Sequence, residues 1–496
     1  MLKFCLFLFS YVLSQEIPVY IALKQRNIDL LKNKLEEISD PSHKRYGNYM
    51  SRNEINSLIH PPIDDQNIVK EWLFTNNIKN IKVNGDSITF IENIDKVNTL
   101  FKRDGLNKEP SYQLPDNIKP LVDFVEMYAN KKVLNRKSKI NIKSKDSQVD
   151  DRYFGRESLK YLYNLTHTHI VNKDVTGGIV EYQNNAGFTN DDLNLQQQSN
   201  CQTLHNITKI NGTNEGTDAE SELDVQLLSQ GADGVNIYYY DSPYWLYSFS
   251  VDLFNSKIVP DVISMSWGWA EDSQCDIIDC SDITSRDYVD RVNTEYIKLG
   301  LRGVTITVSS GDAGAPGRTG EECDVNRPLN AVFPGSSPYV LSIGATYVEN
   351  DDTPRQFNTS LCKDNNCIQG INESVISFDN IGWTAGGGFS QYVNSTPKWQ
   401  RHQVGDYLFS GVTLPNHNKF NPLGRAYPDV SAIGHSCPTY IDGYLNKIDG
   451  TSCSSPVVAS LLVTLNDVLT SLNKSKLGFV NPFLYSLSEK CPHCFN

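Results

Sequence analysis

The chain has 496 residues, with 45 Lys or Arg against 58 Asp or Glu, and 39% of it is hydrophobic. This length allows two or three domains with real hydrophobic cores, and 21% of charged residues excludes a disordered polyampholyte. The net charge of −13 argues against nucleic acid as a partner, because phosphate binding needs a basic surface.

The first predicted element is a secretion signal. The apolar run from Leu2 to Leu13 is about half of the length that a membrane-spanning helix needs. Lys3 supplies the positive charge before it, and the small Ser14 suits a cleavage site. We therefore predict a signal peptide over residues 1–14 and no membrane span.

Cysteines and glycosylation motifs also indicate export. Removal of the signal peptide leaves ten of the 11 cysteines, an even number that can pair as disulfides. No Asn-x-Ser/Thr motif falls between residues 15 and 150. The predicted glycosylation sites are Asn164, Asn206, Asn211, Asn358, Asn372, Asn394 and Asn473. Their placement indicates that the second half of the chain is its mature part.

Residues 15–130 are predicted to form a small α+β unit. Ile28, Leu31 and Leu35 recur at helical spacing before Asp40-Pro41, and Asn84-Gly85 is typical of a hairpin turn. Residues 131–145 then contain seven Lys or Arg and no acid. Such a run predicts a solvated linker, which is also an attractive target for processing proteases.

From about residue 155 the pattern becomes α/β. Short β-branched and aromatic runs alternate with longer helical stretches, which predicts a parallel sheet covered by helices on both faces. The predicted strands lie at Gly178–Val180, Val235–Tyr240, Val262–Ser266, Val304–Ser309 and Tyr339–Ile343, and the helices at Glu222–Leu228, Arg286–Lys298 and Pro456–Leu472. In such sheets chemistry collects at the carboxyl ends of the strands.

A serine-rich turn is the first of three segments that could carry chemistry. Residues Gly450 to Pro456 are small, include Ser452, and precede an apolar helical pattern. A helix N-terminus offers free backbone N–H groups and a partial positive charge, which would stabilise an oxyanion near such a serine. A plain serine N-cap gives the same pattern.

The second segment is acidic. Glu220 and Asp224 are four residues apart, so both carboxylates can share one face of a helix and raise each other's pKa, as a base at acidic pH requires. Asp218 and Glu222 have the same spacing, so spacing does not choose between the two pairs. A solvated acidic face explains the run equally well.

The third segment is the glycine-rich turn around Asp312, directly after an apolar strand. It lies where active sites collect, although an aspartate is also common in ordinary turns. The chain has nine histidines, and none is predicted in a Gly/Thr-rich turn beside a strand end. A nucleophilic serine in this chain would therefore need a carboxylate base, which works at acidic pH.

Together the three segments resemble the sedolisin family of serine-carboxyl peptidases, and within it the tripeptidyl-peptidase branch. Asp449–Pro456 matches the Gly-Thr-Ser-x-Ser-x-Pro nucleophile motif, with Ser452 as nucleophile. Glu220 and Asp224 match the Glu-x-x-x-Asp helix motif, and Asp312 matches the acid of the oxyanion hole. The resemblance implies a Ser-Glu-Asp triad in a subtilisin-like α/β domain, preceded by a propeptide. The resemblance also selects Glu220 and Asp224 over the pair Asp218 and Glu222, which spacing alone does not.

Further segments share the resemblance. Asp40–Met50 is similar to the propeptide signature, so we expect a propeptide over residues 15–150, with the basic linker at about 131–150, and the peptidase domain over 151–496. The resemblance implies substrate-binding roles for Ser266, Gly386, Gly387 and Gly388.

Calcium is the cofactor that the family implies. Its ligands would follow the Cys491-Pro492-His493-Cys494 turn, and that segment is not among the 496 residues. We therefore expect a peptidase domain without the calcium loop, and no metal ligand is assigned.

The resulting hypothesis is a lysosomal or secreted zymogen that acts in acid. It would release tripeptides from the free N-termini of peptides or unfolded proteins, with its own propeptide as inhibitor and folding aid. Three alternatives stay open: an endopeptidase of the same family, an inactive relative acting as a binding protein, and an ordinary subtilisin with a histidine base. The last would be active at neutral pH.

Overall fold

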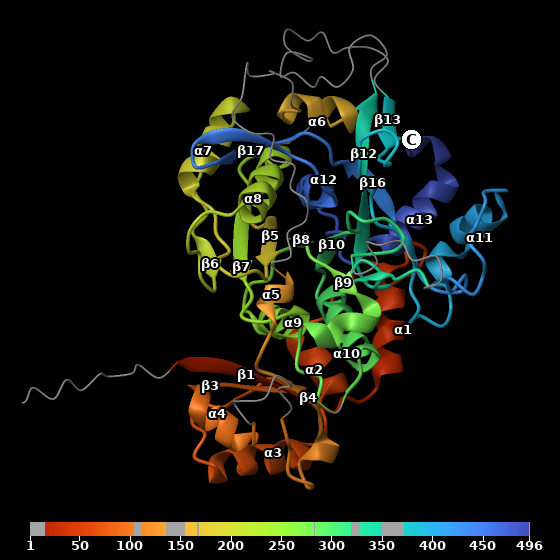
Figure 1. The fold of residues 1–496 in the computed structure, drawn as a ribbon. Helices are drawn as coiled ribbons and strands as arrows, with labels where there is room; N and C mark the ends of the chain where they lie inside the picture. The colour runs from red at the N-terminus through yellow and green to blue at the C-terminus, as the bar shows by residue number, and fades with distance from the viewer. Residues whose placement is uncertain are drawn as a thin grey trace, which may run out of the picture.

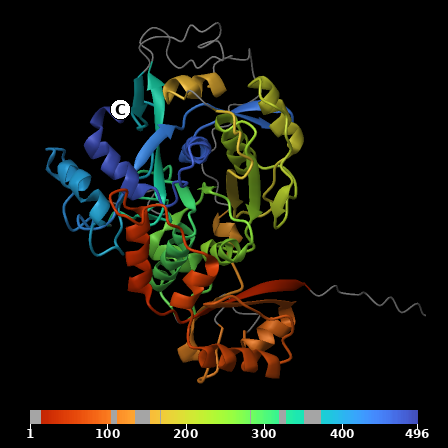
Figure 2. The same ribbon diagram turned by 180° about the vertical axis from the view of Figure 1, so that it is seen from behind.

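A computed structural model describes residues 15–103, 112–134, 154–165, 168–281, 283–318, 328–349 and 372–495. Figure 1 shows a small N-terminal unit below a larger unit, and Figure 2 shows the same arrangement from behind. The predicted signal peptide and the predicted site Asn358 lie outside the described residues.

The N-terminal unit is an antiparallel sheet with helices. Its strands have the order β2-β3-β1-β4, and the predicted hairpin at Asn84-Gly85 joins β2 to β3. Its elements are β1 (Glu16–Leu23), α1 (Ile28–Ser39), α2 (Arg52–Ile59), α3 (Ile63–Thr75), β2 (Lys82–Val83), β3 (Ser87–Asn93), α4 (Ile94–Leu100), a 3-10 helix (Lys119–Leu121), β4 (Val122–Glu126) and α5 (Lys131–Leu134).

The larger unit is built on a mainly parallel sheet. Its elements are α6 (Arg156–Leu162), β5 (Thr176–Glu181), α7 (Asn190–Ser199), β6 (Lys209–Asn211), α8 (Ala219–Gly231), β7 (Asn236–Asp241), α9 (Leu246–Asn255), β8 (Val262–Met265), β9 (Trp269–Ala270), α10 (Ser285–Leu301), β10 (Thr305–Ser309), β11 (Val332–Phe333), β12 (Leu341–Glu349), β13 (Asn372–Val375), β14 (Gly388–Phe389), α11 (Arg401–Phe409), β15 (Ala426–Tyr427), β16 (Val430–Ile433), β17 (Cys437–Ile441), β18 (Tyr444–Ile448), α12 (Thr451–Ser471) and α13 (Asn481–Lys490). Short 3-10 helices lie at Glu271–Asp276, Lys398–Gln400 and Pro492–Cys494.

The central sheet has the order β13-β12-β10-β8-β5-β7-β6, and β16 also pairs with β12. Its pairs are parallel except for β12 with β13. Two hydrophobic cores cover its faces, one with side chains of α9 and α10 and the other with side chains of α8 and α12. The predicted α/β sheet with helices on both faces, preceded by an α+β unit, is confirmed.

Helix α12 passes through the middle of this arrangement (Figure 1). Among the described residues it is the one helix long and apolar enough to cross a membrane, but 72% of its apolar window is buried within the fold. This makes it weak evidence for a membrane span.

The start of α12 corrects the sequence-based expectation. The helix was expected to begin near Pro456, but it begins at Thr451, so Ser452 lies in its first turn. The carboxylate of Asp312 accepts the N–H of Thr451 at 2.8 Å and satisfies a helix-end donor. An acceptor 139 residues away in the sequence left no local trace in the Ser-rich turn.

The N-terminal sheet packs against α9 and α10 through alternate residues. Val19 and Ile21 of β1 lie in the core of the N-terminal unit, whereas Tyr20, Ala22 and Phe124 join the core that contains α9 and α10. Because successive side chains of a strand point to opposite faces, one strand serves both cores.

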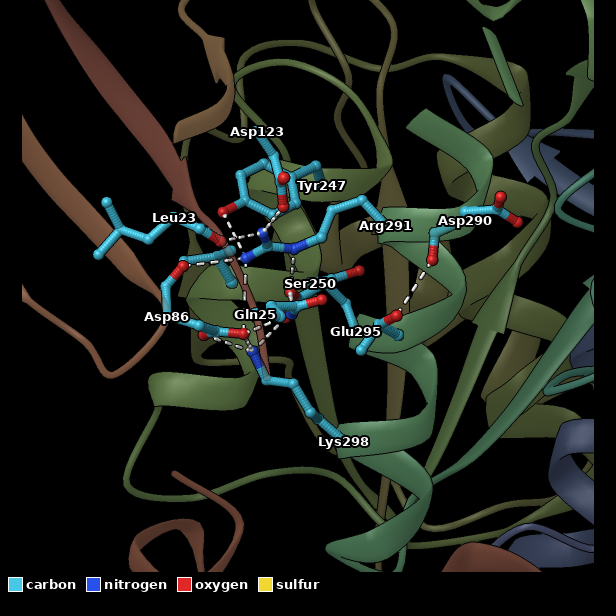
Figure 3. Close-up of polar contacts among 12 residues, drawn as sticks. Leu23, Gln25, Asp86, Asp123, Tyr247, Ser250, Asp290, Arg291, Glu295 and Lys298 are labelled. Atoms are coloured by element: carbon cyan, nitrogen blue, oxygen red, sulfur yellow. Dashed lines mark hydrogen bonds and ion pairs between the residues drawn. The ribbon is translucent and has the colours of Figure 1, made fainter. Parts of the chain in front are cut away.

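A buried cluster of charges links the two units (Figure 3). Lys298 of α10 donates to Asp86 at 2.8 Å and also to Glu295. Arg291 donates to Asp123 at 2.7 Å and to Glu295 at 3.0 Å. The side chains of Asp86, Glu295 and Lys298 are at most 1% exposed. Basic side chains of α10 are therefore neutralised by Glu295 of the same helix and by Asp86 and Asp123 of the N-terminal unit.

The N-terminal unit also caps α9. Trp245, the N-cap residue of this helix, forms no side-chain cap hydrogen bond. The Glu126 carboxylate at the end of β4 instead accepts the N–H groups of Trp245 at 3.2 Å and Ser248 at 3.1 Å. A helix of the larger unit thus depends on a carboxylate of the N-terminal unit for its first turn.

Candidate active site

The four residues singled out in the sequence come together at the carboxyl edge of the central sheet. Glu220 and Asp224 lie on α8, Asp312 follows β10, and Ser452 lies at the start of α12. The two helices pack against each other on one face of the sheet. Three segments far apart in the sequence therefore meet at one point.

Ser452 and Glu220 are in direct contact. The Ser452 side chain acts on Glu220 as a hydrogen-bonding group that lowers its pKa, while the Oε1 atom of Glu220 is buried without a hydrogen-bond partner. Ser452 is 8% exposed, so its side chain lies in a largely buried turn. A carboxylate in this position can accept the hydroxyl proton when serine attacks a carbonyl.

Asp224 lies behind Glu220 and is fully buried. Its Oδ1 atom accepts the hydroxyl of Ser266 at 2.9 Å, and its Oδ2 atom has no hydrogen-bond partner. The same Ser266 hydroxyl lies 3.4 Å from the carbonyl oxygen of Ser452. Ser266, expected to bind substrate, therefore directs its hydroxyl to Asp224.

A third acid, Glu181 at the end of β5, was missed in the sequence. Its Oε2 atom accepts the indole N–H of Trp267 at 2.9 Å, its Oε1 atom lacks a partner, and its charge interacts with that of Asp224. A carboxylate that ends an apolar run of a parallel strand was an available signal. The acidic row thus runs Glu220, Asp224, Glu181.

Burial raises the pKa of each acid in this row. The pKa of Glu220 rises to about 8, against the lowering effect of the Ser452 hydrogen bond. The pKa values of Asp224 and Glu181 rise well above their usual range through burial and the neighbouring carboxylates. Unpartnered oxygens on three adjacent acids are best satisfied by shared protons. The row therefore holds protons while keeping a base next to Ser452.

Asp312 is placed so that its carboxyl group, when protonated, can donate a hydrogen bond. Its Oδ1 atom accepts both the N–H of Thr451 at 2.8 Å and the hydroxyl of Thr451 at 2.7 Å. Its Oδ2 atom is left to carry a proton. Burial raises the pKa of Asp312, although the Thr451 hydrogen bonds lower it. A neutral carboxyl here can donate to an oxyanion formed at Ser452.

The structure also separates the two pairs of acids that have the same spacing. Asp218 is the N-cap of α8 and accepts the N–H groups of Glu220 and Ser221. Glu222 accepts the N–H of Thr189 at 2.7 Å and the amide of Gln226 at 2.9 Å. Of the two pairs, Glu220 and Asp224 form the row that reaches Ser452.

Comparison with known proteins identifies the family. Residues 12–130 match the Pro-kumamolisin activation domain, and residues 242–477 match the Subtilase family. Physarolisin of Physarum polycephalum is 32% identical over 97% of this chain and 86% of its own length. Tripeptidyl-peptidase 1 of Mus musculus is 27% identical over 95% of this chain and 82% of its own length.

The chain belongs to the sedolisin family of serine-carboxyl peptidases. A solved Pseudomonas sedolisin, a serine-carboxyl proteinase, matches 69% of this chain and 87% of its own with a TM-score of 0.51 and 23% identity, which supports the shared fold. The protein is thus a serine peptidase whose N-terminal unit is a propeptide activation domain.

In this sedolisin the expected substrate-binding glycines lie against the Asp312 turn. The N–H of Gly386 donates to the carbonyl of Gly311 at 2.5 Å. A Cβ atom on Gly386 would lie 2.1 Å from the carbonyl oxygen of Ser310, so only glycine fits there. Gly387 approaches the Tyr427 carbonyl, and Gly388 belongs to β14, which pairs with β15. Their contact with substrate stays a prediction.

One histidine lies closer to the site than expected. His435 follows β16, and its Nδ1 atom lies 2.9 Å from Asp449, three residues before the nucleophile. His435 therefore lies beside a strand end, where no histidine was expected. The side chain that meets the Ser452 hydroxyl is nevertheless Glu220. The alternative of a histidine base therefore finds no support in the described geometry.

The one candidate metal group among the described residues does not suit calcium. Calcium takes six to eight oxygen ligands. The candidate metal group among the described residues is Cys491, His493 and Cys494, which offers sulfur and nitrogen, and its two cysteines form a disulfide.

Disulfides are present, as the sequence predicted. Besides the Cys491–Cys494 bond, the structure contains Cys275–Cys280 and Cys437–Cys453, while the exposed Cys201 forms none among the described cysteines. The Cys437–Cys453 bond ties β17 to the residue that follows the nucleophile, a link that sequence reasoning could not assign.

Five predicted glycosylation sites are exposed, so their side chains are accessible to modification. They are Asn164, Asn206, Asn211, Asn394 and Asn473.

Proposed function

We propose that this sedolisin is an acid-acting zymogen that releases tripeptides from the free N-termini of peptides and unfolded proteins. The observation that carries the catalytic part is the contact between Ser452 and Glu220, extended to Asp224 and faced by Asp312. The similarity to tripeptidyl-peptidase 1 over 95% of the chain supports the tripeptidyl part.

In the proposed mechanism Glu220 removes the proton of Ser452 as its oxygen attacks the scissile carbonyl. Asp224 orients Glu220 and shares its proton. Protonated Asp312 donates a hydrogen bond to the tetrahedral oxyanion. Glu220 then returns the proton to the leaving amine, and water hydrolyses the acyl-enzyme by the same steps in reverse.

This mechanism sets a bell-shaped pH dependence. Asp312 must be protonated to donate, so activity falls as pH rises through its raised pKa. The acidic row must keep one ionised carboxylate, so activity also falls when pH is low enough to protonate it completely. Activity is then greatest between these two limits, and we propose that this window lies in the acidic range.

We further propose that the propeptide over residues 15–150 inhibits the enzyme until the linker at about 131–150 is cut in acid. The buried charge cluster and the cap on α9 support a propeptide that also helps the peptidase domain over 151–496 to fold. The predicted signal peptide and exposed Asn-x-Ser/Thr motifs support a lysosomal or secreted location.

The test is hydrolysis of a free-amine tripeptide amide by wild type and Ser452→Ala between pH 3 and 8, after incubation in acid. We expect an optimum below neutral pH and a loss of about 10⁵–10⁶ in turnover in the variant. Activity at neutral pH that survives Ser452→Ala would contradict the proposal.

An N-blocked longer peptide in the same assay separates the family's two activities. Preferential cleavage of that peptide would make the protein an endopeptidase. A folded chain that cleaves neither peptide at any pH would make it a binding protein with a sedolisin fold.

A further inference from the structure

The carboxyl edge of the sheet carries one acid that the catalytic row does not use. Asp241 is the last residue of β7, and it lies opposite Glu181 in the parallel register of β5 and β7. Val180 of β5 lies opposite Met265 of β8, so Ser266 lies level with Glu181 on the other side. Ser266, Glu181 and Asp241 therefore form a row across three neighbouring strands.

This row begins next to the nucleophile, because the Ser266 hydroxyl lies 3.4 Å from the carbonyl oxygen of Ser452. Neighbouring strands are about 4.8 Å apart, so Asp241 lies about 10 Å from Ser266 across the sheet edge. Three extended residues of a peptide also span about 10 Å. The separation matches a tripeptide whose carbonyl end is at Ser452.

The Asp241 carboxylate is only partly satisfied. Its Oδ2 atom accepts the hydroxyl and the N–H of Thr213. Its Oδ1 atom is buried and has no hydrogen-bond partner. A buried carboxylate oxygen without a donor is costly, and a cation that reaches it relieves that cost.

In the zymogen the propeptide already supplies a cation at this place. The segment before the linker crosses the larger unit, where Asn130 donates to the Ile277 carbonyl at 2.6 Å. The Lys131 ammonium that follows donates to the carbonyl of Ser242, the residue after Asp241, at 3.3 Å. Helix α5, which Lys131 begins, lies by the carboxyl end of β5 (Figure 1).

The interaction of Lys131 with Asp241 is electrostatic and mutual. Burial raises the pKa of Asp241, and the Lys131 ammonium lowers it. Burial lowers the pKa of Lys131, and Asp241 raises it. Each group thus favours the charged form of the other.

We propose that Asp241 binds the free α-ammonium group of the substrate and so sets the release of three residues. Lys131 of the propeptide holds an ammonium beside this acid in the zymogen, on the carbonyl of Ser242, and leaves it when the linker is cut. The inference rests on the proposed tripeptidyl activity and names the residue that recognises the substrate's N-terminus. An α-amino group is charged throughout the acidic range, so it can replace the Lys131 ammonium.

The test compares Asp241→Asn with wild type on one tripeptide amide in two forms, a free amine and its N-terminal hydroxyl analogue. Asparagine keeps an acceptor for Thr213 but loses the charge. For the free amine we expect KM to rise about ten- to a hundredfold in the variant with kcat nearly unchanged, as for a lost charge-assisted hydrogen bond. The hydroxyl analogue should be cleaved equally by both enzymes.

Glu215→Gln is the matched control, because it removes an exposed carboxylate whose charge also acts on Asp241. It should leave both substrates unaffected. Equal losses for the two substrates in Asp241→Asn, or the same change in Glu215→Gln, would overturn the proposal. Wild type that cleaves neither peptide would instead refute the proposed function.

A second measurement does not depend on the Asp241 variant folding. Lys131→Gln removes the cation from the linker, and the zymogen should then process faster at a fixed acidic pH than wild type. A matched zymogen with Lys132→Gln, which changes the exposed neighbour of Lys131, should process at the wild-type rate. Equal rates for all three zymogens would show that Lys131 does not cover this acid.

Discussion

Two of the buried clusters of charged side chains among the described residues have opposite compositions. At the propeptide interface, Asp86 lies against the bases of α10, and Figure 3 shows these side chains converging. At the active site, Glu220, Asp224 and Glu181 lie against one another and against hydroxyl and indole groups. Both clusters are almost free of solvent contact.

The difference shows that partners, and not burial alone, decide the charge of a buried acid. Burial alone would raise the pKa of Asp86, but Lys298 and Arg291 outweigh it and lower that pKa. In the row of acids, Arg318 lowers the pKa of Glu220 but does not outweigh burial, and the pKa values of all three acids rise. The acids of the first cluster are ionised in charge pairs, whereas those of the second cluster hold protons. Lowering the pH therefore reduces the stabilisation from the first cluster, and raising the pH reduces that from the second.

The largest expected effect comes from breaking the row of acids at its catalytic end. Glu220→Gln removes the base, so turnover should fall by about 10⁴–10⁶. Glu222→Gln is the matched control, since Glu222 lies on the same helix and is buried against Thr189 and Gln226. Steady-state hydrolysis of the tripeptide amide measures both, and a comparable loss in the control would contradict the assignment of the base.

The next effect comes from breaking the charge pairs. Lys298→Met leaves Asp86 and Glu295 buried without this cation, which should lower the free energy of unfolding of the Ser452→Ala zymogen by about 3–5 kcal/mol. Urea unfolding measures the change. Lys398→Met is the control, because its 2.9 Å pair with Glu36 is solvent-exposed and should contribute less than about 1 kcal/mol.

A smaller effect concerns the stability of the zymogen at low pH. The lowered pKa of Asp86 stabilises the zymogen above its ordinary value of 3.8, and this stabilisation is lost as pH falls through the lowered value. Asp86→Asn should flatten the fall in stability below about pH 4, a change of about 1–3 kcal/mol. Thermal unfolding of Ser452→Ala zymogens from pH 3 to 6 measures this. Parallel curves would mean that other interface groups carry the acid response.

The smallest expected effect is a gain in zymogen stability at neutral pH. Glu181 has a raised pKa, so its contribution to stability is lost as pH rises above its ordinary value of 4.5. Glu181→Gln keeps an acceptor for Trp267 and removes the charge, and should therefore stabilise the zymogen at pH 7 by about 1–2 kcal/mol. It should have little effect at pH 4. Thermal unfolding at the two pH values checks the difference, which would vanish if Glu181 were already ionised in solvent contact.

The sequence predicted the sheet and singled out four residues that the structure brings together, because both leave local patterns. Apolar runs such as Gly178–Val180 and the spacing of Glu220 and Asp224 are visible within a few residues. The comparison with family motifs then chose between pairs that spacing could not separate. The structure adds the contact of Glu220 with Ser452, which no local pattern contains.

What the sequence could not predict depends on contacts between distant segments. The start of α12 depends on Asp312, and the burial of Lys298 depends on Asp86, 212 residues earlier in the chain. Arg291, Glu295 and Lys298 have the spacing of an exposed, salt-bridged helix face, yet the propeptide covers them. Helical periodicity shows which residues share a face but not what covers it.

The cap that Glu126 places on α9 has a consequence for the life of the enzyme after activation. Under the proposed processing, the peptidase domain folds with this carboxylate in place and then works without it. The survival of the mature domain in acid would then depend on the height of its unfolding barrier rather than on an equilibrium. Its working lifetime would be set by its unfolding rate.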